Sequence, residues 1–280
     1  MIFTSFINIL LGPAILGGAA TLLFGYQKHS GKKPGLLFHS VSDNPGKNMS
    51  QYSTANFKNL VDKLKNYSLK TVSLNRYGHS TAEDEILLTF DDGFECIYKN
   101  AVPVLENAGF KGSIFCVAGF AGKESDWDVY ESSRHMSKEQ IIEVSNLGYE
   151  IGSHTLTHAN LPFLSVKDLE KELKESKQIL EDITGKPVRS LSFPFGSFNR
   201  RVWEKALEAG YTSASLYRGN SGTLPGLFPV YGVYRFDGVS DIMRRINDRG
   251  FSISVALARM MSHFSKGTSV WKFRKEYILP

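Results

Sequence analysis

Short apolar segments of strand length alternate with helix-like segments along most of this chain, and this alternation constrains the fold more than any other feature. The apolar segments cover residues 35–41, 70–74, 85–90, 112–117, 149–153, 188–193 and 212–216. Apolar residues at helical spacing, or capping residues, mark the stretches 57–64, 101–108, 137–148, 168–184 and 199–209. Strands that alternate with helices pair in parallel and place the helices outside. The sequence therefore predicts an α/β fold, either an open sheet or a barrel, with its site at the carboxyl ends of the strands.

Local signals mark the ends of two of these helices. Ser137 and Gln140 have the spacing of a capping box, and Gly148 is expected to close the helix that they open. Residues 168–184 place leucine and isoleucine on one face among Lys and Glu, and Gly185 follows directly. This pattern predicts an amphipathic helix whose charged face is solvated.

The composition excludes several classes of protein. Of the 280 residues, 42% are hydrophobic and 22% are charged, which is incompatible with a disordered, collagen-like or coiled-coil chain. The net charge of +5 comes without a long basic run, so nucleic acid is not the expected partner. Cys96 and Cys116 both lie in apolar stretches, where free thiols are expected.

The first 27 residues contain no charged side chain and enough apolar residues to cross a bilayer. They predict an N-terminal hydrophobic helix that anchors the protein in a membrane. A cleavable secretory signal is an alternative, but no Lys or Arg precedes the apolar run, although residues 17–20 are small enough for a processing site. A helix buried against the domain is a third interpretation, which Gly12-Pro13 in the middle of the segment makes less favourable.

The chain then divides into a polar linker at residues 28–34, a folded domain at residues 35–260, and a basic and aromatic tail at residues 261–280. The tail could touch a membrane surface or simply cover the domain. Lys28, Lys32 and Lys33 follow the apolar segment, and the positive-inside rule would keep this flank in the cytoplasm.

Residues that can bind a metal ion or transfer a proton follow several of the predicted strands. His154 and His158 are four residues apart, so one helical turn or a tight loop could bring both imidazoles to one metal ion. Taken alone, this spacing is as often structural as functional. Asp91 and Asp92 come directly after a buried strand, and two adjacent carboxylates there repel unless a cation stands beside them. A turn or helix cap around Gly93 is the alternative interpretation, but it would account for only one of the two aspartates.

Two histidines and one carboxylate with an open position form a known catalytic zinc arrangement. If one of the two aspartates binds the ion, the other can act as general base toward a water whose acidity the ion has raised. The Pro194-Phe195-Gly196 turn could supply backbone donors to a developing oxyanion. His39, at the end of the first strand, is a candidate general acid, although it could equally be a core histidine with satisfied hydrogen bonds. These roles together predict a hydrolase.

Three segments of the chain resemble the motifs of the polysaccharide deacetylases, the NodB homology domain of carbohydrate esterase family 4. They are Thr89-Phe90-Asp91-Asp92-Gly93, His154-Thr155-Leu156-Thr157-His158 and Ser192-Phe193-Pro194-Phe195-Gly196, and the resemblance covers most of residues 34–237. It implies a distorted (β/α)7 barrel as the fold of the catalytic domain.

The resemblance also implies a role for each residue of the site. Asp91 would be the catalytic base, and the metal ligands would be Asp92, His154 and His158. The backbone amide of Phe195 would help to hold the oxyanion. Pro194 and Gly196, on either side of it, are expected to contact substrate.

Departures from the family pattern are informative. The third motif normally begins with an Arg that pairs with the base, whereas this chain has Ser192, so another group must orient Asp91. The usual fourth motif and the late Leu-x-His motif are not recognisable. Instead, Leu37-Phe38-His39-Ser40-Val41 resembles the histidine motif moved to the front, as in the poly-N-acetylglucosamine deacetylases, which gives His39 the role of general acid.

The resulting hypothesis is a metal-dependent hydrolase that removes N-acetyl groups from amino sugars of a poly- or oligosaccharide or an envelope glycan. Zn²⁺ is the expected ion, and Co²⁺ and Ni²⁺ accept the same ligands. Hydrolysis of another amide or of an O-acetyl ester on the same centre is the alternative, and a catalytically inactive glycan-binding module is the alternative from another class. The expected partners are an N-acetylated glycan and a membrane, with no obligate protein partner. Such a substrate favours an envelope location, which the lysines after the apolar segment contradict.

Overall fold

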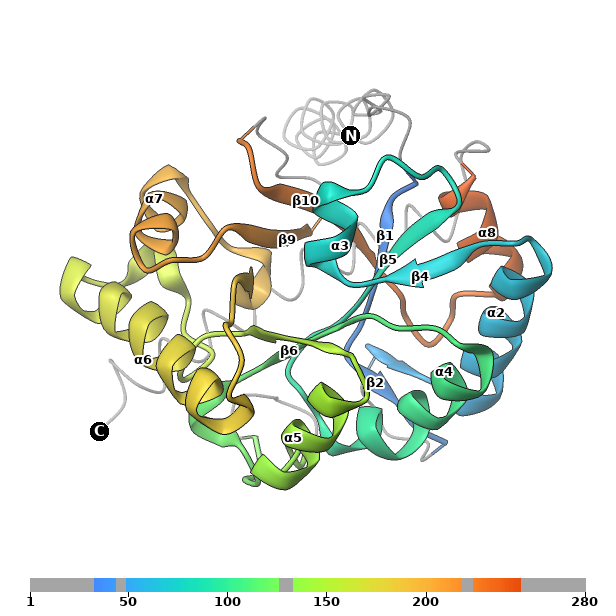
Figure 1. The fold of residues 1–280 in the computed structure, drawn as a ribbon, viewed down its shortest axis with the longest axis horizontal. Coiled ribbons are helices and arrows are strands. Elements are labelled where there is room, and N and C mark those ends of the chain that lie inside the picture. Colours follow the sequence, from blue (N-terminus) through green and yellow to red (C-terminus); the bar gives the residue numbers. More distant parts are fainter. Residues whose placement is uncertain (1–32, 44–48, 126–132, 218–223, 248–280) are drawn as a thin grey trace, which may run out of the picture. The chain divides into compact units, whose positions relative to one another are not determined.

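The computed structural model describes residues 33–43, 49–125, 133–217 and 224–247. Its strands are β1 (Gly35–Phe38), β2 (Ser40–Val41), β3 (Gln51–Tyr52), β4 (Lys70–Val72), β5 (Glu85–Phe90), β6 (Ser113–Cys116), β7 (Glu150–Ser153), β8 (Ser190–Ser192), β9 (Ser213–Tyr217) and β10 (Leu227–Gly232). Within these residues, one sheet has the order β1-β10-β9-β8-β7-β6-β5-β4, and pairing of β1 with β5 closes it into a ring of seven strands (Figure 1). Every pairing in the ring is parallel. The predicted α/β class and distorted (β/α)7 barrel are confirmed.

Besides its pairing with β6, strand β5 pairs with two further strands, one in each half. Its first half pairs with β4 from Lys70↔Glu85 to Val72↔Leu87, and its second half pairs with β1 from Leu36↔Leu88 to Phe38↔Phe90. Strand β4 therefore lies outside the ring, and the ring closes next to the carboxyl end of β5. The residue after this end is Asp91, whose N–H donates to the carbonyl of Phe38 at 2.9 Å.

Helices cover the outside of the strands (Figure 1). They are α2 (Thr54–Asn66), α3 (Leu74–His79), α4 (Val102–Ala108), α5 (Lys138–Asn146), α6 (Val166–Thr184), α7 (Arg200–Glu208) and α8 (Val239–Ile246). Short helical turns occur at η1 (Ile97–Ala101), η2 (Ala118–Phe120), η3 (Leu161–Phe163) and η4 (Pro194–Gly196). The predicted capping box of Ser137 and Gln140 is present at the start of α5, and α6 ends at Gly185 with φ 65°.

An aromatic cluster fills the barrel wall beneath the ends of β1 and β5. The ring of Phe38 lies 5.2 Å from that of Phe57 and 5.8 Å from that of Phe90, and Tyr52 packs on the same ring at 5.6 Å. All four side chains are buried. Edge-to-face and tilted aromatic pairs stabilise a core beyond the area that they bury. This packing fixes the two strand ends that carry His39 and Asp91.

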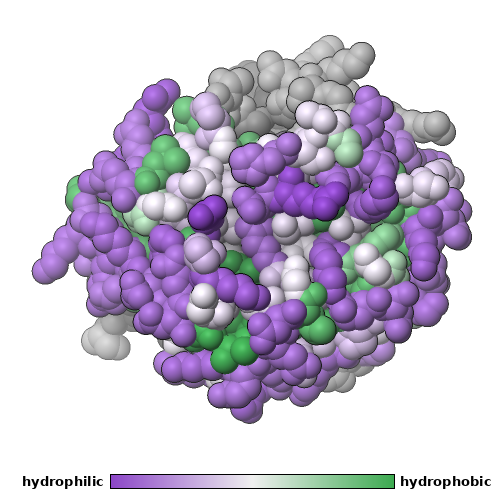
Figure 2. Space-filling model, in the orientation of Figure 1, coloured by the Kyte–Doolittle hydropathy of each residue, from purple (hydrophilic) through white to green (hydrophobic). Residues whose placement is uncertain are grey.

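The visible face of the molecule is mainly hydrophilic, with hydrophobic residues in small separate groups (Figure 2). This pattern agrees with amphipathic helices that turn their apolar faces inward. Among the helices that the structure describes, none is both long and apolar enough to cross a membrane. The predicted hydrophobic segment 1–27 and the tail 261–280 lie outside the described residues, and so does most of the linker 28–34.

Apart from the two-residue strand β3 and short helical turns, three described elements were not expected from the sequence: α3, β10 and α8. Strand β10 matters most, because it pairs with both β9 and β1 and completes the ring. Its sequence, Leu-Phe-Pro-Val-Tyr-Gly, contains a proline, which normally argues against a strand inside a sheet. Both cysteines are free as expected; Cys116 is buried and Cys96 is half-buried.

Candidate metal and catalytic site

Three side chains that could hold a metal ion meet at the carboxyl ends of the strands. Oδ1 of Asp92 lies 3.5 Å from Nε2 of His154 and 3.4 Å from Nε2 of His158. All three residues are buried, and one ligand atom from each lies within 4.8 Å of the others. Two zinc ligands at the usual bond length and tetrahedral angle are about 3.3 Å apart. The two Asp92 contacts therefore fit the ligand spacing of a zinc-sized cation.

The backbone at this site adopts a conformation that side chains rarely tolerate. Among the described residues, five non-glycine residues have positive φ, and four of them are here: Asp92 at 66°, Thr155 at 69°, His158 at 60° and Phe195 at 60°. Such conformations cost about 1–3 kcal/mol each and tend to occur at functional sites. The loops are therefore held by their surroundings in the shape that brings the ligand atoms together.

Contacts with neighbouring groups orient the His154 ring and the Asp92 backbone. The Nδ1 atom of His154 lies 2.9 Å from the carbonyl oxygen of Ser192, which turns Nε2 toward Asp92. The carbonyl of Asp92 is in turn 2.8 Å from Nδ1 of His135. Burial lowers the pKa of His154 to about 3, so its imidazole is neutral, the form that binds metals.

His135 was not singled out from the sequence. It is buried between the rings of Phe94 and Phe120, whose centroids lie 4.9 and 5.6 Å from its own. A single histidine in a polar stretch carries no motif, so no local signal could have found it. Its contact with the Asp92 backbone forms only when residues 43 positions apart meet.

Asp91 is buried beside this cluster and is held by the hydroxyl of Ser192. Ser192 Oγ donates to Asp91 Oδ2 at 2.8 Å, while Oδ1 has no hydrogen-bond partner among the described residues. Burial raises the pKa of Asp91 to about 7, and the Ser192 hydrogen bond opposes part of this increase. A carboxyl group with a pKa near 7 has the proton affinity that suits a general base at neutral pH.

His39 lies on the same side of the barrel, after β1. Its side chain is half-buried, its Nδ1 atom is buried without a hydrogen-bond partner among the described residues, and it is close enough to influence the titration of His154. Burial lowers the pKa of His39 to about 4, so the imidazole is neutral at pH 7.

The Pro194–Gly196 turn forms the remaining wall of the site. The ring of Phe195 meets the ring of His158 edge-on at 4.7 Å, and the turn places Phe195 at φ 60° and ψ 12°. Pro194 is buried, and Phe195 and Gly196 are half-buried. The structure thus brings all the predicted site residues to one end of the barrel, and their individual roles stay predictions.

Comparisons with known proteins agree with this geometry. Residues 78–214 match the family model for polysaccharide deacetylase. The chain is 26% identical over 186 residues to a Bacillus subtilis (strain 168) protein that bears the name "Putative polysaccharide deacetylase YxkH"; the alignment covers 64% of this chain and 62% of YxkH. It is 24% identical over 161 residues to a poly-beta-1,6-N-acetyl-D-glucosamine N-deacetylase of Staphylococcus aureus (strain MRSA252), covering 52% of this chain and 54% of that protein.

Among solved structures, the crystal structure of a polysaccharide deacetylase from Bacillus cereus superimposes with a TM-score of 0.65 at 26% identity. The match covers 76% of this chain and 68% of that one. Each of the two sequence relatives, by contrast, is matched over less than two thirds of its own length.

Proposed function

We propose, from the match of residues 78–214 to the polysaccharide deacetylase family model, that the protein is a metal-dependent hydrolase that removes N-acetyl groups from amino sugars of a glycan. The observation that carries the proposal is the pairing of two sets of side chains. A cluster of Asp92, His154 and His158 can hold a divalent cation, and a separately oriented carboxylate, Asp91, lies beside it.

A divalent cation in this cluster would polarise the acetyl carbonyl and raise the acidity of water near it. Asp91 accepts a proton from the attacking water, whose oxygen forms the new bond to the acetyl carbon. The backbone at Phe195 donates to the developing oxyanion. Ser192 keeps Oδ2 of Asp91 occupied, so the proton goes to Oδ1.

His39 delivers a proton to the leaving nitrogen. Because its imidazole is neutral at pH 7, His39 first takes up a proton from solvent. Asp91 returns the proton of the water to solvent after the reaction, so that the protons balance over one turnover. The carbon–nitrogen bond then breaks, which leaves acetate and a free amine. Pro194 and Gly196 contact the substrate on either side of Phe195.

We propose β-1,6-linked N-acetylglucosamine chains as the first substrate to examine. The support is the name of the staphylococcal relative, together with the position of His39 directly after the first strand of the barrel. Zn²⁺ is the proposed ion, since two imidazoles and a carboxylate suit it, and Co²⁺ or Ni²⁺ could replace it.

We also propose that residues 1–27 anchor the enzyme in a membrane close to an envelope glycan. The support is the uncharged apolar composition of this segment. Membrane fractionation of cells that express the full chain, with protease protection to report its side, tests this location. Recovery in the soluble fraction would contradict it.

The deciding experiment measures metal content and acetate release on the full-length protein with N-acetylglucosamine oligomers of β-1,6 and β-1,4 linkage. The wild type is expected to bind one zinc ion and release acetate. Asp91→Asn should retain the ion and lose acetate release by roughly 10²–10⁴-fold, because the base is absent. His154→Ala should lose both, and Asp62→Asn, an exposed acidic residue on α2, is the matched control.

The other outcomes distinguish the alternatives. Bound zinc without acetate release from these oligomers, but with hydrolysis of an O-acetyl sugar or another amide, would redirect the proposal to that substrate class. Sugar binding with neither metal nor hydrolysis would leave a glycan-binding module.

A further inference from the structure

A buried carboxylate on helix α6 contacts the loop that carries both candidate histidine ligands. Glu172, only 8% exposed, accepts hydrogen bonds from the backbone N–H of Leu156 at 2.9 Å and of Thr157 at 3.0 Å through Oε2. Its Oε1 accepts from the hydroxyl of Thr157 at 2.5 Å. Leu156 and Thr157 lie between His154 and His158, so these three hydrogen bonds act on the centre of the ligand loop.

The carbonyl groups of the loop are held by a different segment of the chain. Ala118 N–H donates to the carbonyl of Thr155 at 3.0 Å, and Gly119 N–H donates to the carbonyl of Leu156 at 2.9 Å. The loop is therefore clamped by two elements: η2 donates to its carbonyls, and α6 accepts from its amides. The positive φ of Thr155 and of His158 requires such a clamp, since neither residue would adopt it freely.

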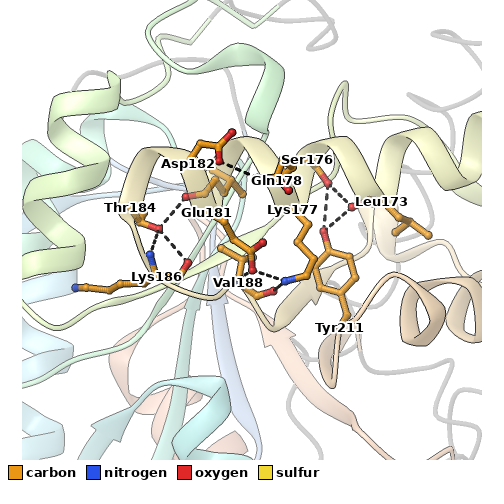
Figure 3. A network of polar contacts seen from close by, with 11 residues as sticks. Leu173, Ser176, Lys177, Gln178, Glu181, Asp182, Thr184, Lys186, Val188 and Tyr211 are labelled. Carbon is orange, nitrogen blue, oxygen red and sulfur yellow. Dashed lines mark hydrogen bonds and ion pairs between the residues drawn. The ribbon is translucent and has the colours of Figure 1, made fainter.

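One helical turn after Glu172, Ser176 provides a second contact from α6 to the same region. Its hydroxyl lies 2.9 Å from that of Ser153, whose oxygen accepts from the N–H of Thr155 at 3.0 Å. Ser176 also approaches the hydroxyl of Tyr211 at 3.2 Å, and Tyr211 donates to the carbonyl of Leu173 (Figure 3). These contacts fix the position of α6 along its axis and its rotation about that axis. They therefore also fix the position of the Glu172 carboxylate.

A carboxylate removed from water is stable only where donors surround it, and charge-assisted hydrogen bonds of this kind are about twice as strong as neutral ones. The donors that meet Glu172 come from two consecutive residues of the ligand loop. The buried carboxylate of Glu172 is therefore stabilised only while the loop keeps the conformation that supplies these donors.

We propose that Glu172 is a positioning residue for the metal centre, acting through the Leu156–Thr157 backbone to keep the imidazoles of His154 and His158 on the same ion. This inference rests on the proposed function, since it concerns the same centre. In this proposal Glu172 acts on the loop and is assigned no contact with substrate or ion.

The test compares Glu172→Gln with the wild type in the full-length protein. The amide keeps the shape of the side chain but removes its negative charge, so the charge-assisted hydrogen bonds to the loop become weaker neutral ones. Zinc affinity, measured by competition with a chelator well below the melting temperature, should fall by about 10–100-fold, as for other groups that orient metal ligands. In the metal-free protein, hydrogen exchange of the Leu156 and Thr157 amides should accelerate.

The matched control is Glu175→Gln, the same change on an exposed position of α6. It should alter neither zinc affinity nor amide exchange. If Glu172→Gln does not fold, Thr157→Val removes only the donor on the loop side and should weaken zinc binding by a smaller factor. Unchanged zinc affinity in a folded Glu172→Gln protein, or in Thr157→Val, would overturn the inference.

Failure of the proposed function gives a different result. A wild-type protein that binds no zinc disproves the metal centre itself, whatever Glu172 does. A wild type that binds zinc and releases acetate, beside a Glu172→Gln variant of equal affinity, disproves only the positioning role.

Discussion

Ser192 contributes two different groups to the site. Its hydroxyl donates to Asp91, and its carbonyl accepts from the His154 ring, so one residue orients the proposed base and a proposed ligand. This contact answers the question raised by the missing Arg of the third motif. At this position a neutral hydroxyl stands in place of the cationic Arg side chain. Burial is therefore the largest influence on the Asp91 carboxyl group and raises its pKa to about 7.

Replacing Ser192 by Ala removes the hydroxyl and retains the carbonyl. A hydrogen bond to a charged group contributes about 1.5–3 kcal/mol, so kcat should fall by roughly 10–100-fold, while KM and zinc affinity stay near the wild-type values. Steady-state kinetics with a zinc titration check this. Ser215→Ala, at the register partner on β9, is the control, and an equal loss of kcat there would contradict the assignment.

His39 should make stability depend on pH. Its folded-state pKa of about 4 is below the unfolded value near 6.5, so the unfolded chain takes up the proton first as the pH falls. The contribution of the neutral His39 imidazole to the free energy of unfolding is therefore complete above pH 6.5 and is lost as the pH falls from 6.5 to 4. Between pH 7 and pH 4.5 this loss should be roughly 2 kcal/mol.

Urea unfolding of the metal-free protein at both pH values measures this effect. His39→Gln should reduce the difference between the two free energies of unfolding. His79→Gln changes an exposed histidine and should leave the difference at the wild-type value. An undiminished difference in the His39 variant would show that its imidazole is not buried in the neutral form.

At the level of elements, the site depends on how closely η2 approaches the ligand loop. A Cβ atom at Gly119 would lie 2.6 Å from the carbonyl oxygen of Leu156, and at that distance the backbone must shift. A similar restriction applies at Gly93, where φ is 68° and a Cβ would lie 2.9 Å from the Cys116 sulfur. Both glycines allow neighbouring segments to pack where a larger residue would separate them.

Gly119→Ala is therefore expected to destabilise the protein by about 1–3 kcal/mol and also to weaken zinc binding, because the displaced contact lies on the ligand loop. Chemical unfolding and chelator competition measure the two effects. Gly109→Ala introduces strain at φ 72° with no atom within 4 Å of the new carbon. That control should lower stability without changing zinc affinity, and a parallel loss of affinity in both variants would contradict the prediction.

For the molecule as a whole, the candidate centre joins strands that lie apart in the sequence. Its ligands follow β5 and β7, so a bound cation would connect two parts of the ring. Any ion that binds the folded protein and not the unfolded chain shifts the folding equilibrium.

Zinc at 100 times its dissociation constant should add about 2.7 kcal/mol to the stability. This corresponds to a rise in the melting temperature of roughly 5–8 °C, which a chelator should reverse. Differential scanning calorimetry of the chelated and reloaded protein measures the change. His154→Ala should abolish it, and the same rise in that variant would place the ion elsewhere.

The sequence by itself determined five helices, most strands and the candidates for the site residues, because these depend on local periodicity, on capping residues such as Ser137, and on short motifs. The tertiary structure decided what depends on contacts between distant residues. Strand β10 closes the ring despite Pro229, because its partners β1 and β9 are fixed by the rest of the barrel. Ser192 meets Asp91 across 101 positions, and Glu172 reaches Thr157 from the outer helix. Such contacts have no period along the chain, since only the folded barrel brings their atoms together.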